Sequence, residues 1–278
     1  MEVLRYAAFT DDSNGGNPAG VVLDANGSDD VEMLAVAAEV GYSESAFLVP
    51  VEDRRFAIRY FSPLAEVPFC GHATIATGVA WAERHGAGTM LLDTAAGEVR
   101  VETSTSDGLT TATLTSVPPD LAALDDVVAE RLLDALRWTS DDLDQALPLR
   151  VAFAGAWHPV VAAATRARLA DLDDDFDALS GLMAEHGWTT VQLVHRTGPT
   201  AFDVRNPFPP GGIVEDPATG AAAAALGGYL RTLSLVDLPA TLHLRQGDDL
   251  GRPSRLTVDV PAADGTGIAV TGSAVPLP

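Results

Sequence analysis

The sequence predicts an α+β protein built from two similar halves. The chain has 278 residues, which is enough for two domains of roughly 140 residues each. Apolar stretches typical of strands alternate with a smaller number of helical segments. Two segments, 69–81 and 215–226, share a design in which a loop leads into an Ala-rich helix. Cys70 and Asp216 lie at these two entries and are 146 residues apart, close to half of the chain, which suggests an internal duplication.

The first half begins with strand-like segments and contains two expected helices. One helix, over 31–40, follows Asp29 and Asp30, whose acidic side chains suit a helix N-terminus. The other, over 70–86, is rich in Ala and Thr and ends at a glycine. Strands are expected, in chain order, at 2–10, 18–24, 47–50, 56–61, 89–94, 98–103 and 109–115.

A domain boundary is expected in 117–126, where two prolines precede an acidic stretch, so that the halves are 1–118 and 119–265. A final strand, about 266–278, is expected to return to the first half. In the second half, helices are expected at 125–137, 173–186 and 217–231, and strands at 150–155, 157–164, 189–195, 200–204, 240–245 and 254–260; a further strand at 267–272 lies within the returning segment. The two Ala-rich helices are small on nearly all sides, as expected for helices closely wrapped by strands.

Composition excludes several classes of function. The net charge is −22, and all 17 basic residues are arginines. Nucleic acids and anionic membranes attract clustered basic side chains, so neither is an expected partner. Without lysine, the chain cannot form a Schiff base with pyridoxal phosphate or supply the lysine of a phosphate-binding loop. A single cysteine and six dispersed histidines give no reason to expect a metal site.

The N-terminus and the apolar stretches indicate a soluble, cytoplasmic protein. The segment 1–9 lacks the basic region and apolar core of a signal peptide. The apolar run 221–226 is far shorter than a membrane span.

Three residues of the first half could carry chemistry. Glu44 lies between an expected helix and an apolar strand, where desolvation would suit a carboxyl group that moves protons, although spacing alone favours a surface acid at a strand edge. His72 lies at the start of the first Ala-rich helix and could donate to a substrate carboxylate, or simply cap or pack. Cys70 lies near the same helix end, where a thiol is either activated or a small buried group.

The second half offers a further acid and several turn residues. Asp216 precedes Pro217, so it is expected to cap the second Ala-rich helix and could also face a ligand. Asn17 and Gly247 lie in turns that could line a ligand site. Arg252 is either a partner for a substrate carboxylate or a member of a surface ion pair.

Taken together, these motifs resemble the PhzF-like family of phenazine-biosynthesis proteins, whose fold is similar to that of diaminopimelate epimerase. The matching segments, in chain order, are FT…GGNPAGVV (9–22), SESAF (43–47), FSPLAEVPFCGHAT (61–74), RNPFPPGGIVEDPATG (205–220) and QGDDLGRPS (246–254). The resemblance implies two pseudo-symmetric domains, each a curved, mostly antiparallel sheet or barrel around a central helix, with the active cleft between them. It also implies a homodimeric isomerase that needs no cofactor or metal.

Carried onto this sequence, the resemblance makes Glu44 the acid/base group, with His72 and Asp216 as the other catalytic residues. Substrate contacts are expected from Asn17, Cys70, Gly71, Ala73, Thr219, Gly220, Ala221 and Gly247. At position 221 the phenazine enzymes have a serine that contacts the substrate. Its replacement by alanine argues against their substrate but not against the reaction class.

The predicted function is therefore proton relocation within a small carboxylate-bearing metabolite, with Glu44 as the acid/base group. Two alternatives stay open. One is a racemase or epimerase in which Cys70 and Asp216 act on opposite faces, since epimerases of this fold use a cysteine at each helix entrance. The other is a family member that binds a metabolite or a partner protein without turnover.

Overall fold

The structure, a computed structural model, describes residues 1–95 and 97–278 and divides into two compact units. The first unit comprises Met1–Thr115, Gly251–Arg255 and Thr271–Pro278, and the second comprises Ser116–Leu250 and Leu256–Val270. Among the described residues, no helix combines the length and the apolar character that crossing a membrane requires.

Arg252 explains why the first unit includes 251–255, which the expected division placed in the second half. Its guanidinium donates from Nε to the carbonyl oxygen of Gly16 at 2.8 Å and from Nη2 to that of Gly15 at 2.5 Å. In addition, the Arg255 N–H donates to the carbonyl oxygen of Phe9. Arg252 therefore stabilises a turn of the first unit through backbone contacts.

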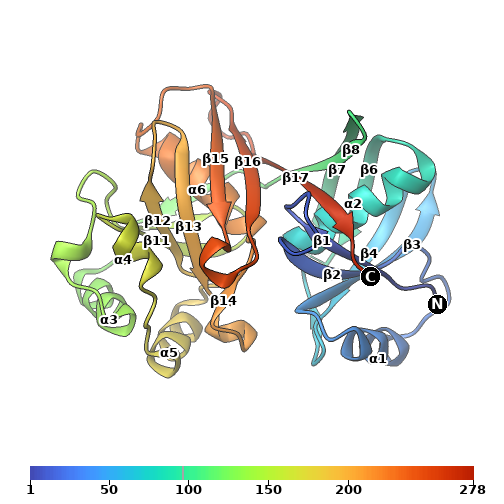
Figure 1. The fold of residues 1–278 in the computed structure, drawn as a ribbon, viewed down its shortest axis with the longest axis horizontal. Helices are drawn as coiled ribbons and strands as arrows, with labels where there is room; N and C mark the ends of the chain where they lie inside the picture. The colour runs from blue at the N-terminus through green and yellow to red at the C-terminus, as the bar shows by residue number, and fades with distance from the viewer. Residues whose placement is uncertain (96) are drawn as a thin grey trace. The chain divides into compact units, whose positions relative to one another are not determined.

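The first unit is a closed ring of strands around helix α2 (Figure 1). The order around the ring is β17, β1, β2, β3, β4, β6, β7, β8 and back to β17, with β2–β3 and β4–β6 parallel. The elements are β1 (Leu4–Ala8), β2 (Asn17–Val22), α1 (Asp30–Val40), β3 (Glu44–Glu52), β4 (Arg55–Phe61), β5 (Glu66–Val67), α2 (Gly71–His85), β6 (Gly88–Thr94), β7 (Gly97–Ser106), β8 (Leu109–Thr115) and β17 (Ala269–Pro276).

Helix α2 fits inside this ring because its side chains are small. A Cβ atom on Gly78 would lie 3.0 Å from Val101 Cγ1 and 3.1 Å from Ala112 Cβ, so β7 and β8 approach the helix closely. The buried hydroxyls of Thr74 and Thr77 donate to the carbonyl oxygens four residues earlier. These bonds satisfy polar groups that would otherwise be buried at a cost of about 1–3 kcal/mol each.

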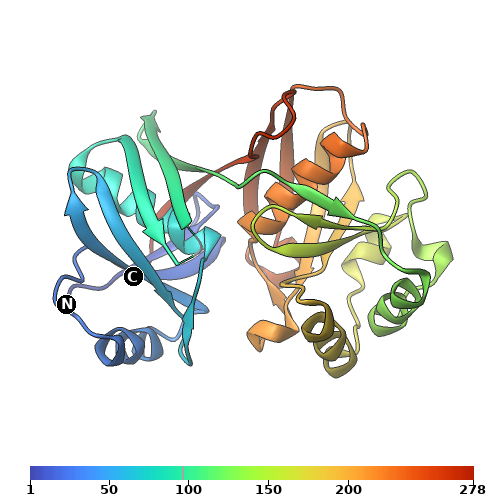
Figure 2. The ribbon, with the colours of Figure 1, turned by 180° about the vertical axis from the view of Figure 1, so that it is seen from behind.

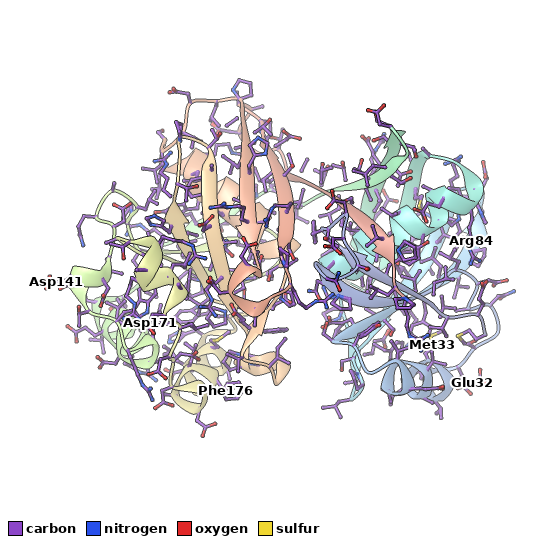
Figure 3. All side chains as sticks on the ribbon, viewed as in Figure 1. Glu32, Met33, Arg84, Asp141, Asp171 and Phe176 are labelled. Atoms are coloured by element: carbon purple, nitrogen blue, oxygen red, sulfur yellow. The ribbon has the colours of Figure 1, made fainter. Side chains whose placement is uncertain are left out.

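Helix α1 covers the outside of the same sheet. Its N-cap is Asp29, as expected, and the carboxylate accepts the N–H of Glu32 at 2.9 Å. Met33 and Ala37 are buried and pack in a cluster with Phe47. Figure 3 labels two neighbouring residues of this helix, Met33, which is buried, and Glu32, which is exposed.

The second unit is a curved mixed sheet around helix α6 (Figure 2). Strands pair in the order β9, β10, β11, β12, β13, β15, with β14 on β13 and with β11–β12 and β13–β15 parallel. Its elements are β9 (Asp120–Ala122), α3 (Asp126–Leu136), β10 (Arg150–Phe153), β11 (Trp157–Ala162), α4 (Arg166–Ala170), α5 (Phe176–His186), β12 (Gln192–Arg196), β13 (Ala201–Pro207), β14 (Glu215–Asp216), α6 (Gly220–Thr232), β15 (Ala240–Gln246) and β16 (Ser254–Val260).

The core of the second unit has two parts. Helix α6 is buried along almost its whole length, and a Cβ atom on Gly228 would lie 2.4 Å from Pro119 Cβ. Helices α3 and α5 pack against the other face of the sheet through Leu136 and Leu179, and Trp188, which follows α5, belongs to the same cluster. The predicted α+β fold, with each Ala-rich helix wrapped by strands, is confirmed.

The two units repeat one chain topology. In the first, β1–β2–β3–β4 are followed by the short strand β5, helix α2 and strand β6 beside β4. In the second, β10–β11–β12–β13 are followed by β14, α6 and β15 beside β13. Helices α2 and α6 begin at Gly71 and Gly220, with Cys70 and Thr219 as their N-caps.

The expected pairing of Cys70 with Asp216 is therefore wrong. Thr219 occupies the position equivalent to Cys70, and Asp216 lies three residues earlier in β14 rather than capping α6. The cause is the loop that precedes the short strand, which spans 208–214 in the second unit and only 62–65 in the first. The helix starts are consequently 149 residues apart, not 146.

A buried histidine gives the second unit a specific pH dependence. His158 on β11 is fully buried, and its Nδ1 lies 2.9 Å from Thr190 Oγ1. Burial lowers the pKa of His158 from 6.5 to about 4. Below pH 6.5 the unfolded chain takes up a proton at this residue that the folded chain does not accept until about pH 4. The free energy of unfolding should therefore fall by up to roughly 3 kcal/mol as the pH drops through this window.

Urea unfolding of the wild type and of His158→Gln at pH 7 and pH 4.5 checks this expectation. The loss of unfolding free energy between the two pH values should be smaller in His158→Gln, while His243→Gln, at an exposed position, should behave as the wild type. An identical pH dependence in all three proteins would contradict the role of His158.

Candidate active site

Glu44, Cys70 and His72 form one compact cluster in the first unit, called here the acid–thiol–imidazole cluster. The carboxylate Oε2 of Glu44 lies 3.5 Å from His72 Nε2 and 3.6 Å from Cys70 Sγ. Cys70 Sγ lies 3.3 Å from His72 Nδ1. The three residues, which the sequence singled out separately, are therefore brought together by the fold.

The topology of the ring explains how these residues meet. Glu44 is the first residue of β3 and pairs with Ala19 of the parallel strand β2. Cys70 caps α2, and His72 lies in its first turn. The Glu44 side chain is only 14% exposed, so the alternative of a freely solvated surface acid does not hold.

A chain of hydroxyl groups fixes the start of α2. The Tyr60 hydroxyl lies 2.7 Å from Thr74 Oγ1, which donates to the carbonyl oxygen of Cys70 at 2.7 Å. Burial raises the pKa of Tyr60, so the phenol remains a hydrogen-bond donor over the whole physiological range. The position of the Cys70 backbone is consequently set by strand β4.

The contact between Glu44 and His72 is longer than a tight, charge-assisted hydrogen bond. A charge-assisted N–H···O hydrogen bond is typically about 2.7–2.9 Å long, shorter than the separation of 3.5 Å between His72 Nε2 and Glu44 Oε2. Ser43 Oγ lies at the same distance from His72 Nε2. Glu44 is thus held in place without being locked into a tight ion pair, which suits a group that must accept and return a proton.

In the second unit, Asp216, Thr219 and Gln246 form a hydrogen-bonded group at the entry to α6. The Thr219 hydroxyl donates to Asp216 Oδ2 at 2.6 Å, and Gln246 Nε2 donates to the Asp216 carbonyl oxygen at 2.7 Å. Gln246 Oε1 accepts the N–H of Thr219 at 3.0 Å. Asp216 and Gln246 are buried, so this arrangement is fixed by the fold.

A buried ion pair fixes strand β14, which carries Asp216, against strand β13. Arg205 on β13 donates to Glu215 on β14 through Nε at 2.9 Å and through Nη2. Arg205 Nη1 also donates to the carbonyl oxygen of Ala170 at 2.6 Å. The first unit has the equivalent pair at the same place in the topology, Arg59 and Glu66, but there it is partly exposed.

The remaining predicted contact residues lie at the starts of β2, α2 and α6 and directly after β15. Asn17 begins β2 and is buried. Gly71 and Ala73 lie in the first turn of α2, while Gly220 and Ala221 lie in the first turn of α6. Gly247 follows Gln246 directly and has a φ of +76°, which glycine adopts without strain.

Reasoning from the sequence did not single out Ser43, Arg205, Glu215 or Gln246. Ser43 and Gln246 each adjoin a residue that was named, Glu44 and Gly247, so position along the chain was the available signal. The sequence signal for the Arg–Glu pairs was clearer. In both halves an arginine precedes the loop before the Ala-rich helix, and a glutamate follows that loop.

Comparison with known proteins identifies the family of the chain. The family described as phenazine biosynthesis-like protein matches residues 6–277. An isomerase of Escherichia coli O157:H7, YddE, is 32% identical, with 99% of this chain and 96% of that protein covered. The trans-2,3-dihydro-3-hydroxyanthranilate isomerase of Pseudomonas chlororaphis is 30% identical, with 86% and 83% covered.

Solved structures show the same fold. A PhzF-family phenazine biosynthesis protein from Bacillus anthracis superimposes with a TM-score of 0.89 at 26% identity, over 100% of this chain and 98% of the other. A probable proline racemase from Agrobacterium radiobacter K84 gives a TM-score of 0.68 at 16% identity, over 99% and 90%, and supports the fold alone. The chain therefore belongs to the phenazine biosynthesis-like family of isomerases.

Proposed function

We propose that the protein relocates a proton within a small carboxylate-bearing substrate, with Glu44 as the group that removes and returns the proton. The observation that carries this proposal is the acid–thiol–imidazole cluster, in which a largely buried carboxylate lies 3.5 Å from an imidazole nitrogen at the N-terminus of a long helix. Positioned acid/base groups of this kind typically contribute about 10²–10⁴-fold to rate.

The N-terminus of α2 supports binding of an anionic substrate. The first N–H groups of a helix have no partner within the helix, and the helix dipole favours negative charge there. In this chain Gly71, His72 and Ala73 form that turn beside Glu44. We assign His72 to orienting and polarising the substrate carboxylate or carbonyl. Asp216 remains a predicted catalytic residue and Thr219 a predicted substrate contact, supported by the burial of Asp216 and by their mutual hydrogen bond.

A related isomerase suggests the type of substrate. The Pseudomonas chlororaphis relative is named for trans-2,3-dihydro-3-hydroxyanthranilate, a cyclic, unsaturated amino acid. We propose that this chain takes a small unsaturated carboxylate but not that compound itself, because Ala221 lacks the hydroxyl that the resemblance leads one to expect at this position. A site that has lost a hydrogen-bonding hydroxyl leaves its substrate partner unpaired, at a cost of about 1–3 kcal/mol.

The two-base racemase that the sequence left open is less well supported. That racemase would use Cys70 and Asp216, but Thr219, not Asp216, occupies the position equivalent to Cys70, and the Asp216 carboxylate accepts a hydrogen bond from the Thr219 hydroxyl at 2.6 Å. A threonine hydroxyl is also a far weaker acid than a thiol. A mechanism with one acid/base group on one face of the substrate fits these positions better.

Solvent isotope exchange tests the proposal. The protein is incubated in D₂O with a panel of small unsaturated, amino and hydroxy carboxylates, and exchange is followed by NMR. We expect deuterium at a new carbon position, with the configuration of existing stereocentres retained. Inversion at the exchanging carbon would support the racemase instead. Binding of panel members without exchange or product would contradict both enzymatic mechanisms.

A further inference from the structure

We propose that the acid–thiol–imidazole cluster binds one Zn²⁺ ion through Glu44 Oε2, Cys70 Sγ and His72 Nε2, and that the ion blocks the proton transfer proposed for Glu44. Among the described residues, these are the His, Cys, Asp and Glu side chains whose donor atoms converge. Binding of the metal stands independently of the proposed function, whereas the inhibition rests on it.

The spacing of the three donors fits tetrahedral zinc. The Nε2–Oε2, Sγ–Oε2 and Sγ–Nε2 distances are 3.5, 3.6 and 3.9 Å. With Zn–S at about 2.3 Å and Zn–N and Zn–O at about 2.0–2.2 Å, the edges of a tetrahedron are about 3.3–3.6 Å long. The Sγ–Nε2 distance must shorten by a few tenths of an ångström, and because Cys70 Sγ lies nearer His72 Nδ1 (3.3 Å) than Nε2 (3.9 Å), the imidazole ring must also turn so that the Nε2 lone pair faces the ion.

The chemistry of the donors selects zinc over the commoner hard cations. A thiolate prefers soft or borderline metals, and Mg²⁺ and Ca²⁺ prefer oxygen ligands. The charges also balance, because a thiolate and a carboxylate supply −2 and a neutral imidazole adds none. On binding, the S–H bond of Cys70 breaks, the sulfur lone pair forms the Zn–S bond, and the proton is released to solvent.

The cluster is largely shielded from solvent, and the helix start that carries Cys70 is fixed. Cys70 and His72 are 8% and 5% exposed, and the carbonyl of Cys70 is fixed by Thr74. Three protein ligands leave a fourth position for water or a substrate carboxylate. Zinc would then occupy the oxygen of Glu44 that the proposed reaction needs for the proton, so turnover should fall when zinc binds and return when a chelator removes it.

Cobalt substitution provides the test, because Co²⁺ takes the same ligands and is coloured. Metal-free protein is titrated with Co²⁺ and followed by absorption. We expect one Co²⁺ per chain, with sulfur-to-metal charge transfer in the near ultraviolet and the strong visible bands of a tetrahedral site, both displaced by Zn²⁺. Absence of the charge-transfer band would overturn the proposal.

Variants and thiol labelling sharpen the result. Cys70→Ser should lose the charge-transfer band, Glu44→Gln and His72→Asn should weaken Zn²⁺ binding at least about tenfold, and His243→Asn, at an exposed histidine, should not. Cys70 is the only cysteine, so labelling of the wild type by a thiol reagent reports this site alone, and Zn²⁺ should slow it. Labelling that Zn²⁺ leaves unchanged would contradict the site even if a variant fails to fold.

The failure of one proposal is distinguishable from the failure of the other. A cobalt spectrum of the expected form, in a protein that exchanges no isotope with any substrate, would support the metal site and contradict the isomerisation. Isotope exchange in a protein without the expected cobalt spectrum would support the isomerisation and contradict the metal site.

Discussion

Glu44→Gln is expected to lower kcat by about 10²–10⁴-fold while leaving the fold intact. Glutamine has nearly the same shape as glutamate and can still accept from Cys70, but it cannot take a proton from carbon at neutral pH. Because only proton transfer is removed, KM should change much less than kcat. Steady-state kinetics with the substrate found by isotope exchange, together with thermal unfolding, measures both effects.

Strand β3 supplies a matched control for this variant. Glu52, at the other end of the same strand, is exposed, and Glu52→Gln should retain wild-type turnover. Wild-type turnover in Glu44→Gln would remove Glu44 from the mechanism. Loss of turnover together with a large drop in thermal stability would show instead that the carboxylate has a structural role.

The largest expected effect on stability is at Arg205. Its guanidinium forms a buried pair with Glu215, whose side chain is 2% exposed. In Arg205→Ala, the Glu215 carboxylate would be buried without its cation, which typically costs 3–5 kcal/mol. The donation to Ala170 is lost as well. We therefore expect urea unfolding of the second unit, followed by Trp138, Trp157 and Trp188 fluorescence, to shift to much lower urea.

The equivalent ion pair of the first unit provides the control for Arg205→Ala. Arg59 and Glu66 occupy the equivalent position in the first unit, with side chains 29% and 39% exposed. Arg59→Ala should therefore cost about 1 kcal/mol or less, because solvent screens the pair. Equal costs at Arg59 and Arg205 would contradict the importance of burial. The double variant Arg205→Met/Glu215→Leu should recover most of the stability, since apolar pairs of similar volume often replace buried ion pairs without loss.

Arg205 is also expected to act on the site through Asp216. Glu215 and Asp216 are adjacent on β14, which pairs with Asn206 and Pro207. Displacement of Glu215 would therefore disturb the hydrogen bond between Asp216 and Thr219. At temperatures where Arg205→Ala is still folded, a raised KM would separate this positioning effect from simple unfolding.

The parts of the fold that depend on local pattern could be predicted from the sequence. The two Ala-rich helices and most of the longer strands follow from side-chain size and alternation, and α2 and α6 lie near their expected bounds. The two-residue strands β5 and β14 could not be predicted, because they form only by pairing with β4 and β13. The short helix α4 was missed for a similar reason, since five residues carry too little periodicity.

The site shows the same division between local and distant determinants. Glu44, Cys70 and His72 could be named one by one, but their convergence depends on β2 and β3 pairing in parallel. The error at Asp216 arose because an acid before proline also fits a helix cap. The better alignment was present in the sequence, where Pro68-Phe69-Cys70-Gly71 matches Pro217-Ala218-Thr219-Gly220.

Strand β17 has a consequence for biosynthesis. It is the last strand of the chain and pairs with β1, the first, joining Tyr6 to Pro276 and Ala8 to Ala274. Domains generally fold as units in the order in which the ribosome releases them. Here the ring of the first unit lacks one strand until residues 269–276 have been made, so the first unit can close only after the residues of the second unit have been synthesised.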